Sequence, residues 1–296
     1  MEQPVCPTDL LYQICYGYYE GTHRDGLCCY QRWSGSCCGR PFVVEGEVRS
    51  AAVATREDWG ARDFDVAALD ARTRALLAKE WLSDALMEHA SVASFARFVL
   101  DLLAVGAPAA LVERAQVAIG DEIAHARACF ALAGRYAADA LGPGPLATHE
   151  PGRSVLLEDL AAAAVREGCV GETLAALQAQ AQLAVAKDER VRETLELIAR
   201  DEENHAELAW AFVRWAIDRG GDSVRRAVRE AFRAAELQLS SPEVVAMPSV
   251  DQAAFAAHGR LSPAALAACH RDGFVEVIAP CASALLSART HEAHHH

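Results

Sequence analysis

Four glutamates and two histidines have the spacing needed to bind metal ions. In two places a glutamate and a histidine lie three residues apart, which puts both on one side of a helix and within reach of one ion. A single glutamate precedes each pair on its own helical segment, and it could bridge or complete a coordination sphere. Carboxylate and imidazole ligands together suit ions such as iron and manganese. The sequence therefore predicts a metal site formed by Glu88, Glu122, His125, Glu172, Glu202 and His205.

Each of these residues lies on an apolar stripe with helical spacing. Steps of three and four residues place the members of a stripe on one side of a helix. A buried carboxylate without a partner is costly, so four of them demand a compensating charge, which metal ions supply. The stripes are Leu77, Trp81, Ala85, Glu88, Val92, Phe95, Val99 and Leu102; Leu111, Ala115, Ala118, Glu122, His125, Cys129, Leu132 and Tyr136; Ala161, Val165, Cys169, Glu172, Ala176 and Leu183; and Val191, Leu195, Ile198, Glu202, His205, Ala209, Phe212 and Ala216.

Helix-breaking residues divide the middle of the chain into four long helices. Gly106 ends the first, which starts at about Val66, and Pro108 opens the second after a short turn, so these two are antiparallel neighbours. The second helix ends at about Ala140, and the segment from Leu141 to Arg153 is rich in Gly and Pro. Extended, these thirteen residues reach roughly 43 Å, enough to cross a bundle lengthwise.

The third and fourth helices form a second hairpin. Ser154 is the expected cap of the third helix, which runs to about Ala186. A turn near 187–190 reverses the chain, and the fourth helix runs to Arg219 before Gly220-Gly221. Two antiparallel hairpins joined by a long crossover predict an all-α, four-helix bundle with ferritin-like connectivity.

The carboxylates are expected at one level of this bundle. Glu88 lies eighteen residues before Gly106 and Glu122 sixteen residues after it. Glu172 and Glu202 are similarly placed about the second turn. A single Glu-x-x-His pair is common by chance, whereas two level-matched pairs on core stripes favour a two-metal site.

The ligand pattern resembles that of the ferritin-like di-iron carboxylate superfamily, which includes rubrerythrins, bacterioferritins and di-iron oxygenases. The likeness covers about residues 70 to 220; Met87–Phe95 and Glu167–Thr173 are also similar to bacterial ferritin-like domain proteins, which implies no function. The resemblance implies two iron ions, with manganese or a mixed pair as the alternative, that react with dioxygen or peroxide. It implies that His125 and His205 each hold one ion, and it leaves Glu122 and Glu202 as either terminal or bridging ligands.

Neighbouring residues leave several roles open. The second ring nitrogen of each histidine needs an acceptor, which Asp121, Asp201 or a residue of a neighbouring helix could provide. Glu167 lies about 140° around an α-helix from Glu172. It is expected to act as a second-shell group, with an extra ligand as in rubrerythrins or a surface charge as alternatives. His89 is expected at a surface or interface, and Cys129 and Cys169 in the core.

The first forty residues differ from the rest. They have few aliphatic residues, and segments of this kind usually need disulfides or a metal. A zinc or rubredoxin-like site would use C-x-x-C pairs, which are missing, so three disulfides are expected, with the pairing open. They would indicate an oxidising, extracytoplasmic compartment, the export signal being absent from the given sequence; otherwise the protein is cytoplasmic. The cysteines are Cys6, Cys15, Cys28, Cys29, Cys37 and Cys38.

Three regions are expected: the cysteine-rich segment 1–65, the metal-binding bundle 66–221, and a helical extension 222–293 packed on the bundle. The extension is expected to contain a helix to about Leu239, a break at Ser240-Ser241-Pro242, and one or two helices between Ser262 and Ala288. The net charge of −13 argues against nucleic acid as a partner. No apolar run is long enough for a transmembrane helix. The oligomeric state is open, with a dimer as the expectation.

The leading functional hypothesis is a di-iron oxidoreductase of the oxidase or oxygenase type acting on an unknown small molecule. One alternative is ferroxidase or iron-handling activity, although the cysteine-rich start and the C-terminal extension argue against a ferritin cage. A second is a rubrerythrin-like peroxide scavenger, which here lacks the usual C-x-x-C electron donor. A third is a non-enzymatic interaction module that the metal merely stabilises.

Overall fold

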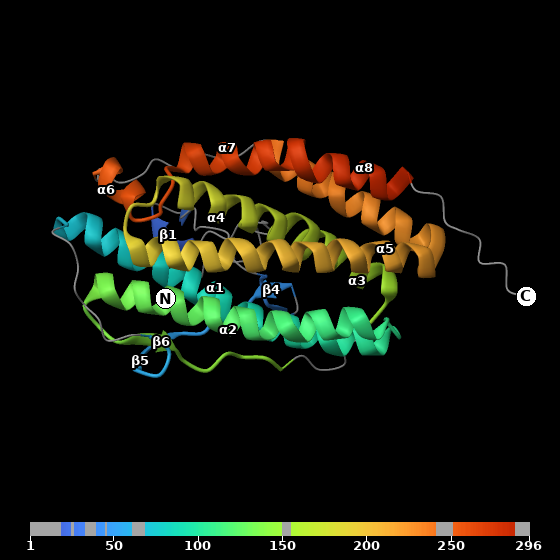
Figure 1. Ribbon diagram of the computed structural model, residues 1–296, viewed down its shortest axis with the longest axis horizontal. Helices are drawn as coiled ribbons and strands as arrows, with labels where there is room; N and C mark the ends of the chain where they lie inside the picture. The colour runs from blue at the N-terminus through green and yellow to red at the C-terminus, as the bar shows by residue number, and fades with distance from the viewer. Residues whose placement is uncertain are drawn as a thin grey trace, which may run out of the picture.

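Helices make up most of the part of the chain that the structure describes, which confirms the all-α prediction. The computed structural model describes residues 19–24 and 27–32 by their backbone, and residues 40–44, 46–60, 69–149, 155–240 and 251–287 in full. In these ranges no helix has an apolar stretch that could cross a membrane. The helices (Figure 1) are α1 (Ala71–Ala104), α2 (Ala109–Ala137), α3 (Leu157–Ala164), the π-helix η1 (Val165–Glu172), α4 (Thr173–Val185), α5 (Glu189–Ser240), α6 (Gln252–Ala257), α7 (Pro263–Gly273), the π-helix η2 (Phe274–Ile278) and α8 (Ala279–Ser287).

The strands are short and form antiparallel pairs outside the helical core. Only the third pair joins distant parts of the chain, because β6 follows α2 whereas β5 precedes α1. This pairing fixes the start of the crossover against the segment that leads into the first helix. The pairs are β1 (Tyr19–Arg24) with β2 (Leu27–Arg32), β3 (Val43–Val44) with β4 (Glu47–Val48), and β5 (Val53–Thr55) with β6 (Leu141–Pro143).

Helices α1 and α2 are antiparallel neighbours, as predicted. The first helix begins at Ala71 and not near Val66, because the Asp70 side chain accepts hydrogen bonds from the amides of Arg72 and Thr73 and so caps the helix. The second ends at Ala137, slightly before the predicted end. Ala138 follows it in the left-handed conformation, with φ of 56°, which turns the chain out of the helix.

The third bundle helix consists of α3, η1 and α4 in one continuous run. It begins at the opposite end of the molecule from the end of α2 (Figure 1), which fits the predicted crossover. Leu156 is its N-cap residue and provides no side-chain cap; the expected cap, Ser154, lies outside the described residues. The π-helical turn was not predicted. The π-helix lies where Gly168 packs closely against α5. A Cβ added at Gly168 would lie 2.3 Å from the Cβ of Ala209.

Helix α5 contacts α2 and the whole α3–η1–α4 run. It bends at Gly221, where φ is 62° and ψ is −140°, so the predicted end of the fourth bundle helix is confirmed as a kink. The chain then turns back and remains helical to Ser240. Helices α7, η2 and α8 lie along α4 and α5 (Figure 1), as expected for the extension, while α6 was not predicted.

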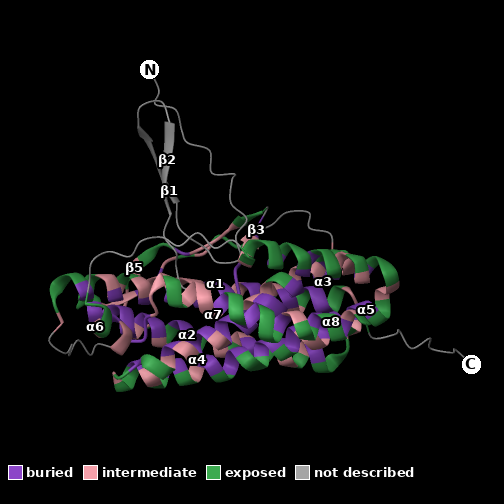
Figure 2. Ribbon diagram, turned by 90° about the horizontal axis from the view of Figure 1, so that it is seen from above, coloured by how far each residue is buried: buried purple, intermediate pink, exposed green. Residues whose placement is uncertain are grey.

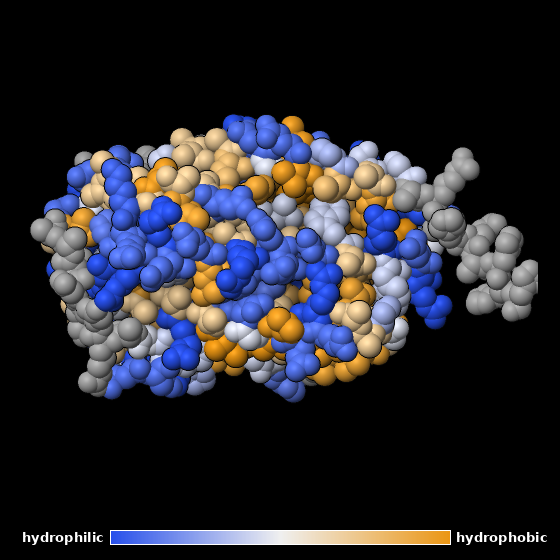
Figure 3. Space-filling model, viewed as in Figure 1, coloured by the Kyte–Doolittle hydropathy of each residue, from blue (hydrophilic) through white to orange (hydrophobic). Residues whose placement is uncertain are grey.

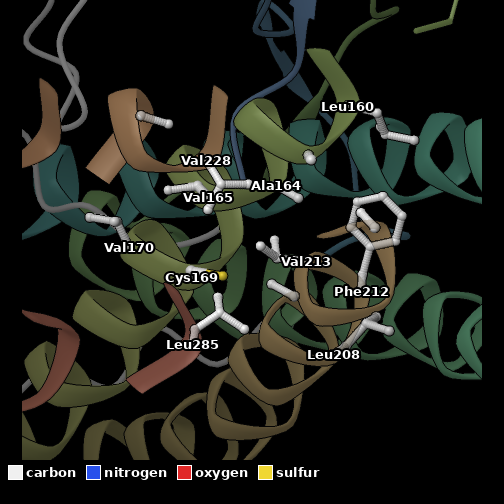
Figure 4. Close-up of a cluster of buried hydrophobic side chains, with 14 of the residues drawn as sticks. Leu160, Ala164, Val165, Cys169, Val170, Leu208, Phe212, Val213, Val228 and Leu285 are labelled. Atoms are coloured by element: carbon white, nitrogen blue, oxygen red, sulfur yellow. The ribbon is translucent and has the colours of Figure 1, made fainter. Parts of the chain in front are cut away.

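Two hydrophobic clusters fill the space between the helices. One contains Leu77, Trp81, Phe130 and Tyr136, and the other contains Phe95 and many residues of η1, α5 and α8. Figure 4 shows part of the second cluster, with Cys169, Val213 and Leu285 together. Buried positions line the inner side of each long helix (Figure 2). Between the clusters every bundle helix carries buried charged side chains.

Candidate metal centre

All six predicted ligands meet in one polar layer across the bundle. Their relative exposure is between 0% and 3%. On α1, α2 and α5 the layer falls between the two hydrophobic clusters, for example between Ala85 and Phe95 on α1. The predicted equal level of the carboxylates is therefore confirmed. The members of the layer are Glu88 from α1, Glu122 and His125 from α2, Glu172 from η1, and Glu202 and His205 from α5.

The six side chains form two overlapping groups of four. One group is Glu88, Glu122, His125 and Glu202, and the other is Glu122, Glu172, Glu202 and His205. Within each group, one ligand atom per residue lies within 4.8 Å of all the others. We refer to them as the His125 position and the His205 position. Each position could hold one metal ion, and the two share a pair of glutamates.

The shared glutamates present a different oxygen to each position. In Glu122, Oε2 lies 3.8 Å from Nδ1 of His125, whereas Oε1 lies 3.4 Å from Nδ1 of His205. In Glu202, Oε1 lies 3.6 Å from His125 Nδ1 and Oε2 lies 3.5 Å from His205 Nδ1. Glu88 lies at the His125 position only, with its Oε2 3.8 Å from that ring. This arrangement suits two bridging and two terminal carboxylates.

The ligand atoms of this layer have no hydrogen-bond partner among the described residues. This holds for both oxygens of all four glutamates and for Nδ1 of both histidines. A buried polar atom without a partner typically costs about 1–3 kcal/mol, and more when it is charged. So many unpartnered atoms pointing at one another would be strongly destabilising by themselves. Bound cations would satisfy them, and the donor set fits iron or manganese.

The outer nitrogen of each histidine contacts an aspartate on the facing helix. Nε2 of His125 on α2 lies 3.2 Å from Oδ2 of Asp201 on α5, and Nε2 of His205 on α5 lies 3.2 Å from Oδ2 of Asp121 on α2. Both aspartates were among the predicted acceptors, and the structure shows that the pairing crosses between helices. Such contacts fix the ring so that Nδ1 faces the centre and make the imidazole a stronger ligand.

The terminal carboxylates have strongly shifted pKa values. Burial raises the pKa of Glu88 well above its usual range, and the charge of Glu122 adds to this increase. Burial and the charge of Glu202 raise the pKa of Glu172 in the same way. Without a cation in the layer, these two carboxyl groups therefore bind protons more tightly than exposed carboxyl groups do.

The histidine pKa values are also raised. Burial by itself lowers the pKa of His125, but Asp201 and Glu88 outweigh this effect and raise it well above the usual value. For His205, Asp121 and Glu122 outweigh burial in the same way. Protons thus supply part of the positive charge that the buried carboxylates need, and cations would replace them.

Glu167 is engaged away from the ligand layer. Its Oε2 lies 3.1 Å from Nε of Arg40, a residue only 3% exposed that precedes the bundle. The Arg40 guanidinium also lies over the rings of Phe95 and Phe98, at 5.0 and 4.4 Å from their centroids. Glu167 belongs to neither group of four. Glu167 therefore forms an ion pair with Arg40, which could not be predicted because nothing in the sequence marks Arg40.

The other residues that the sequence singled out lie outside the two groups of ligands. His89 is half-buried and contacts the edge of Trp59, with 5.2 Å between ring centroids. Cys129 and Cys169 are buried in the core, as predicted. The six cysteines expected to form disulfides lie outside the residues whose side chains the structure describes, although the backbone of Cys28 and Cys29 belongs to β2.

Comparison of the chain with protein-family models, with curated proteins and with solved structures gives no match. The geometry of the layer is therefore the basis for assigning a function.

Proposed function

We propose that the protein is a di-iron carboxylate oxidoreductase with a ferritin-like four-helix bundle. The observation that carries the proposal is the sharing of Glu122 and Glu202, because each presents one oxygen to His125 and the other to His205. A single-ion site would not need two carboxylates in this arrangement. A pair of iron ions is the leading cofactor, with manganese or a mixed pair as the alternative.

In this proposal the four helices hold the ligands in place before the ions bind. Glu88 and Glu172 would be the terminal ligands from α1 and η1, and Glu122 and Glu202 would be shared by the two ions. Two ferrous ions would supply electrons for the reduction of dioxygen or peroxide. The buried position of the layer excludes bulk water, which strengthens the interaction of the ligands with the ions.

The choice between oxidase, oxygenase, ferroxidase and peroxidase chemistry depends on the second substrate. No ligand-layer residue distinguishes them, so the proposal is limited to reaction with dioxygen or peroxide and an unknown small molecule. An extracytoplasmic location remains part of the proposal and rests only on the cysteine content of residues 1–40.

Anaerobic loading with ferrous ion followed by air tests the proposed function. We expect two ions per chain, oxygen uptake, and the near-ultraviolet absorption of the diferric state. Glu202→Ala should abolish this behaviour, whereas Glu203→Ala, which changes the exposed neighbour on α5, should preserve it. Fewer than one ion per chain would contradict the metal centre. Two ions without oxygen uptake would instead support a metal-stabilised interaction module.

A further inference from the structure

The two histidines have the same contact to an aspartate but different surroundings. The distance from Nε2 to the carboxylate oxygen is 3.2 Å in both pairs. Besides their terminal ligands Glu88 and Glu172, the two positions differ in what else touches Asp121 and Asp201.

Arg200 binds Asp201 with two hydrogen bonds. Its Nε donates to Oδ1 at 2.9 Å, and its NH2 donates to Oδ2 at 3.1 Å, the same oxygen that contacts His125. Asp201 is 8% exposed in this arrangement. Its charge is matched by one guanidinium, and the oxygen facing the histidine is shared between two donors.

Asp121 has no such partner. Its side chain is 29% exposed, and in the described part of the chain no lysine or arginine forms a salt bridge with it. Arg200 acts on Asp121 only through space, and Asp121 lies next to both solvent and His205. Hydrophilic side chains gather over α5 on the face shown in Figure 3, the face that also includes α2 in Figure 1.

A carboxylate strengthens a histidine ligand by accepting its outer N–H, and such contacts typically change metal affinity by about 10–100-fold. A competing donor on the same oxygen weakens this effect, and a nearby positive charge also repels a cation. The competing donor is present on Asp201, which supports His125, whereas no arginine or lysine of the described residues forms a salt bridge with Asp121, which supports His205.

We infer that Arg200 makes the two positions unequal, so that a divalent cation binds first and more tightly at the His205 position and second at the His125 position. The inference rests on the proposed two-ion centre. Arg200 is a positioning residue here, because it acts on the ion through Asp201 and His125. Its side chain is 67% exposed, so the effect of its charge is moderated by water.

Titration of the metal-free protein with Co²⁺ tests this inference by calorimetry and visible absorption. The wild type should bind two ions in two steps that differ in affinity by about tenfold or more. Arg200→Gln should strengthen the second step by roughly two- to fivefold and leave the first step almost unchanged. Asp121→Asn should weaken the first step by about tenfold. Arg114→Gln is the matched control, since Arg114 is exposed on α2 and contacts Asn204 and Glu207 instead of an aspartate of the centre.

A crystal grown with one equivalent of Co²⁺ should show anomalous density at the His205 position. Two ions of equal affinity, a first ion at the His125 position, or an Arg200→Gln protein with an unchanged second step would each overturn the inference and leave the two-ion centre intact. A wild-type protein that binds one ion or none would overturn the centre itself, and the inference with it.

Discussion

His125 on α2 faces Asp201 on α5, with 3.2 Å between Nε2 and Oδ2. The reverse contact, from His205 on α5 to Asp121 on α2, has the same length. Each aspartate directly precedes the glutamate of its own Glu-x-x-His pair, so each Asp-Glu-x-x-His segment supplies ligands on its own helix and supports the histidine of the other. The metal layer therefore also links α2 to α5.

The bridging arrangement predicts that removing a shared ligand lowers the metal content more than removing a terminal ligand. Glu122→Ala should lower the metal content by more than one ion per chain, because both positions lose an oxygen. Glu88→Ala should lower it by one ion, because only the His125 position uses Glu88. Metal analysis after desalting measures both. Glu113→Ala, on the exposed side of α2, should keep two ions, and equal losses in the two ligand variants would contradict the bridging roles.

The ligand layer could be predicted from the sequence because each ligand is fixed by local periodicity. Helix spacing alone places Glu122 and His125 on the same side as Ala118 and Cys129. The height of the layer along the bundle follows from the number of residues between each ligand and the nearest turn. Both kinds of information are local on α1, α2 and α5, whereas Glu172 ends the π-helix η1, where α-helical spacing does not apply.

The crossed aspartate contacts, the π-helix and Arg40 could not be predicted in this way. Arg40 and Glu167 are 127 residues apart, and the packing of Arg40 on Phe95 and Phe98 depends on the path of the segment before α1. The η1 turn accompanies the close approach of Gly168 to Ala209, which also depends on tertiary packing.

The raised pKa values predict opposite pH dependences for the metal-free and the metal-loaded protein. Glu88, Glu172, His125 and His205 all have pKa values above their usual ones in the fold, so the native state binds more protons than the unfolded state. The stability that they contribute is therefore lost as pH rises through the folded pKa values. Glu202, whose pKa is lowered by the histidines despite burial, acts in the opposite sense, and so does Asp201, whose pKa is lowered to about 2 by His125 and Arg200 despite burial.

Thermal unfolding between about pH 5 and pH 8 measures this dependence. The melting temperature of the metal-free protein should fall as pH rises, whereas metal affinity should increase because protons no longer compete. The double variant Glu88→Gln and Glu172→Gln should flatten the slope of the metal-free protein. A metal-free protein that becomes more stable as pH rises through this range would contradict the assigned proton uptake.

The contact of Gly168 with α5 predicts that η1 does not tolerate a side chain at this position. Gly168→Ala would place a Cβ about 2.3 Å from the Cβ of Ala209, so the helices must separate or η1 must shift. Such overpacking typically costs about 1–3 kcal/mol in the free energy of unfolding, and denaturant unfolding measures it. Adding Ala209→Gly should restore part of the loss. Gly120→Ala, in α2 with no atom within 4 Å of the new Cβ, should be neutral or stabilising.

The ion pair between Arg40 and Glu167 predicts a structural role that is separable from metal binding. Arg40→Leu removes the buried partner of Glu167, and breaking one side of a buried ion pair typically costs about 3–5 kcal/mol; Glu167 is 17% exposed, so the lower end is expected. Glu167→Gln keeps the size of the side chain and should still allow two ions per chain, because Glu167 belongs to neither group of ligands. Chemical denaturation and metal analysis distinguish the two effects. Loss of one ion in Glu167→Gln would instead make Glu167 a ligand, because a residue that only anchors Arg40 affects stability and not the number of ions bound.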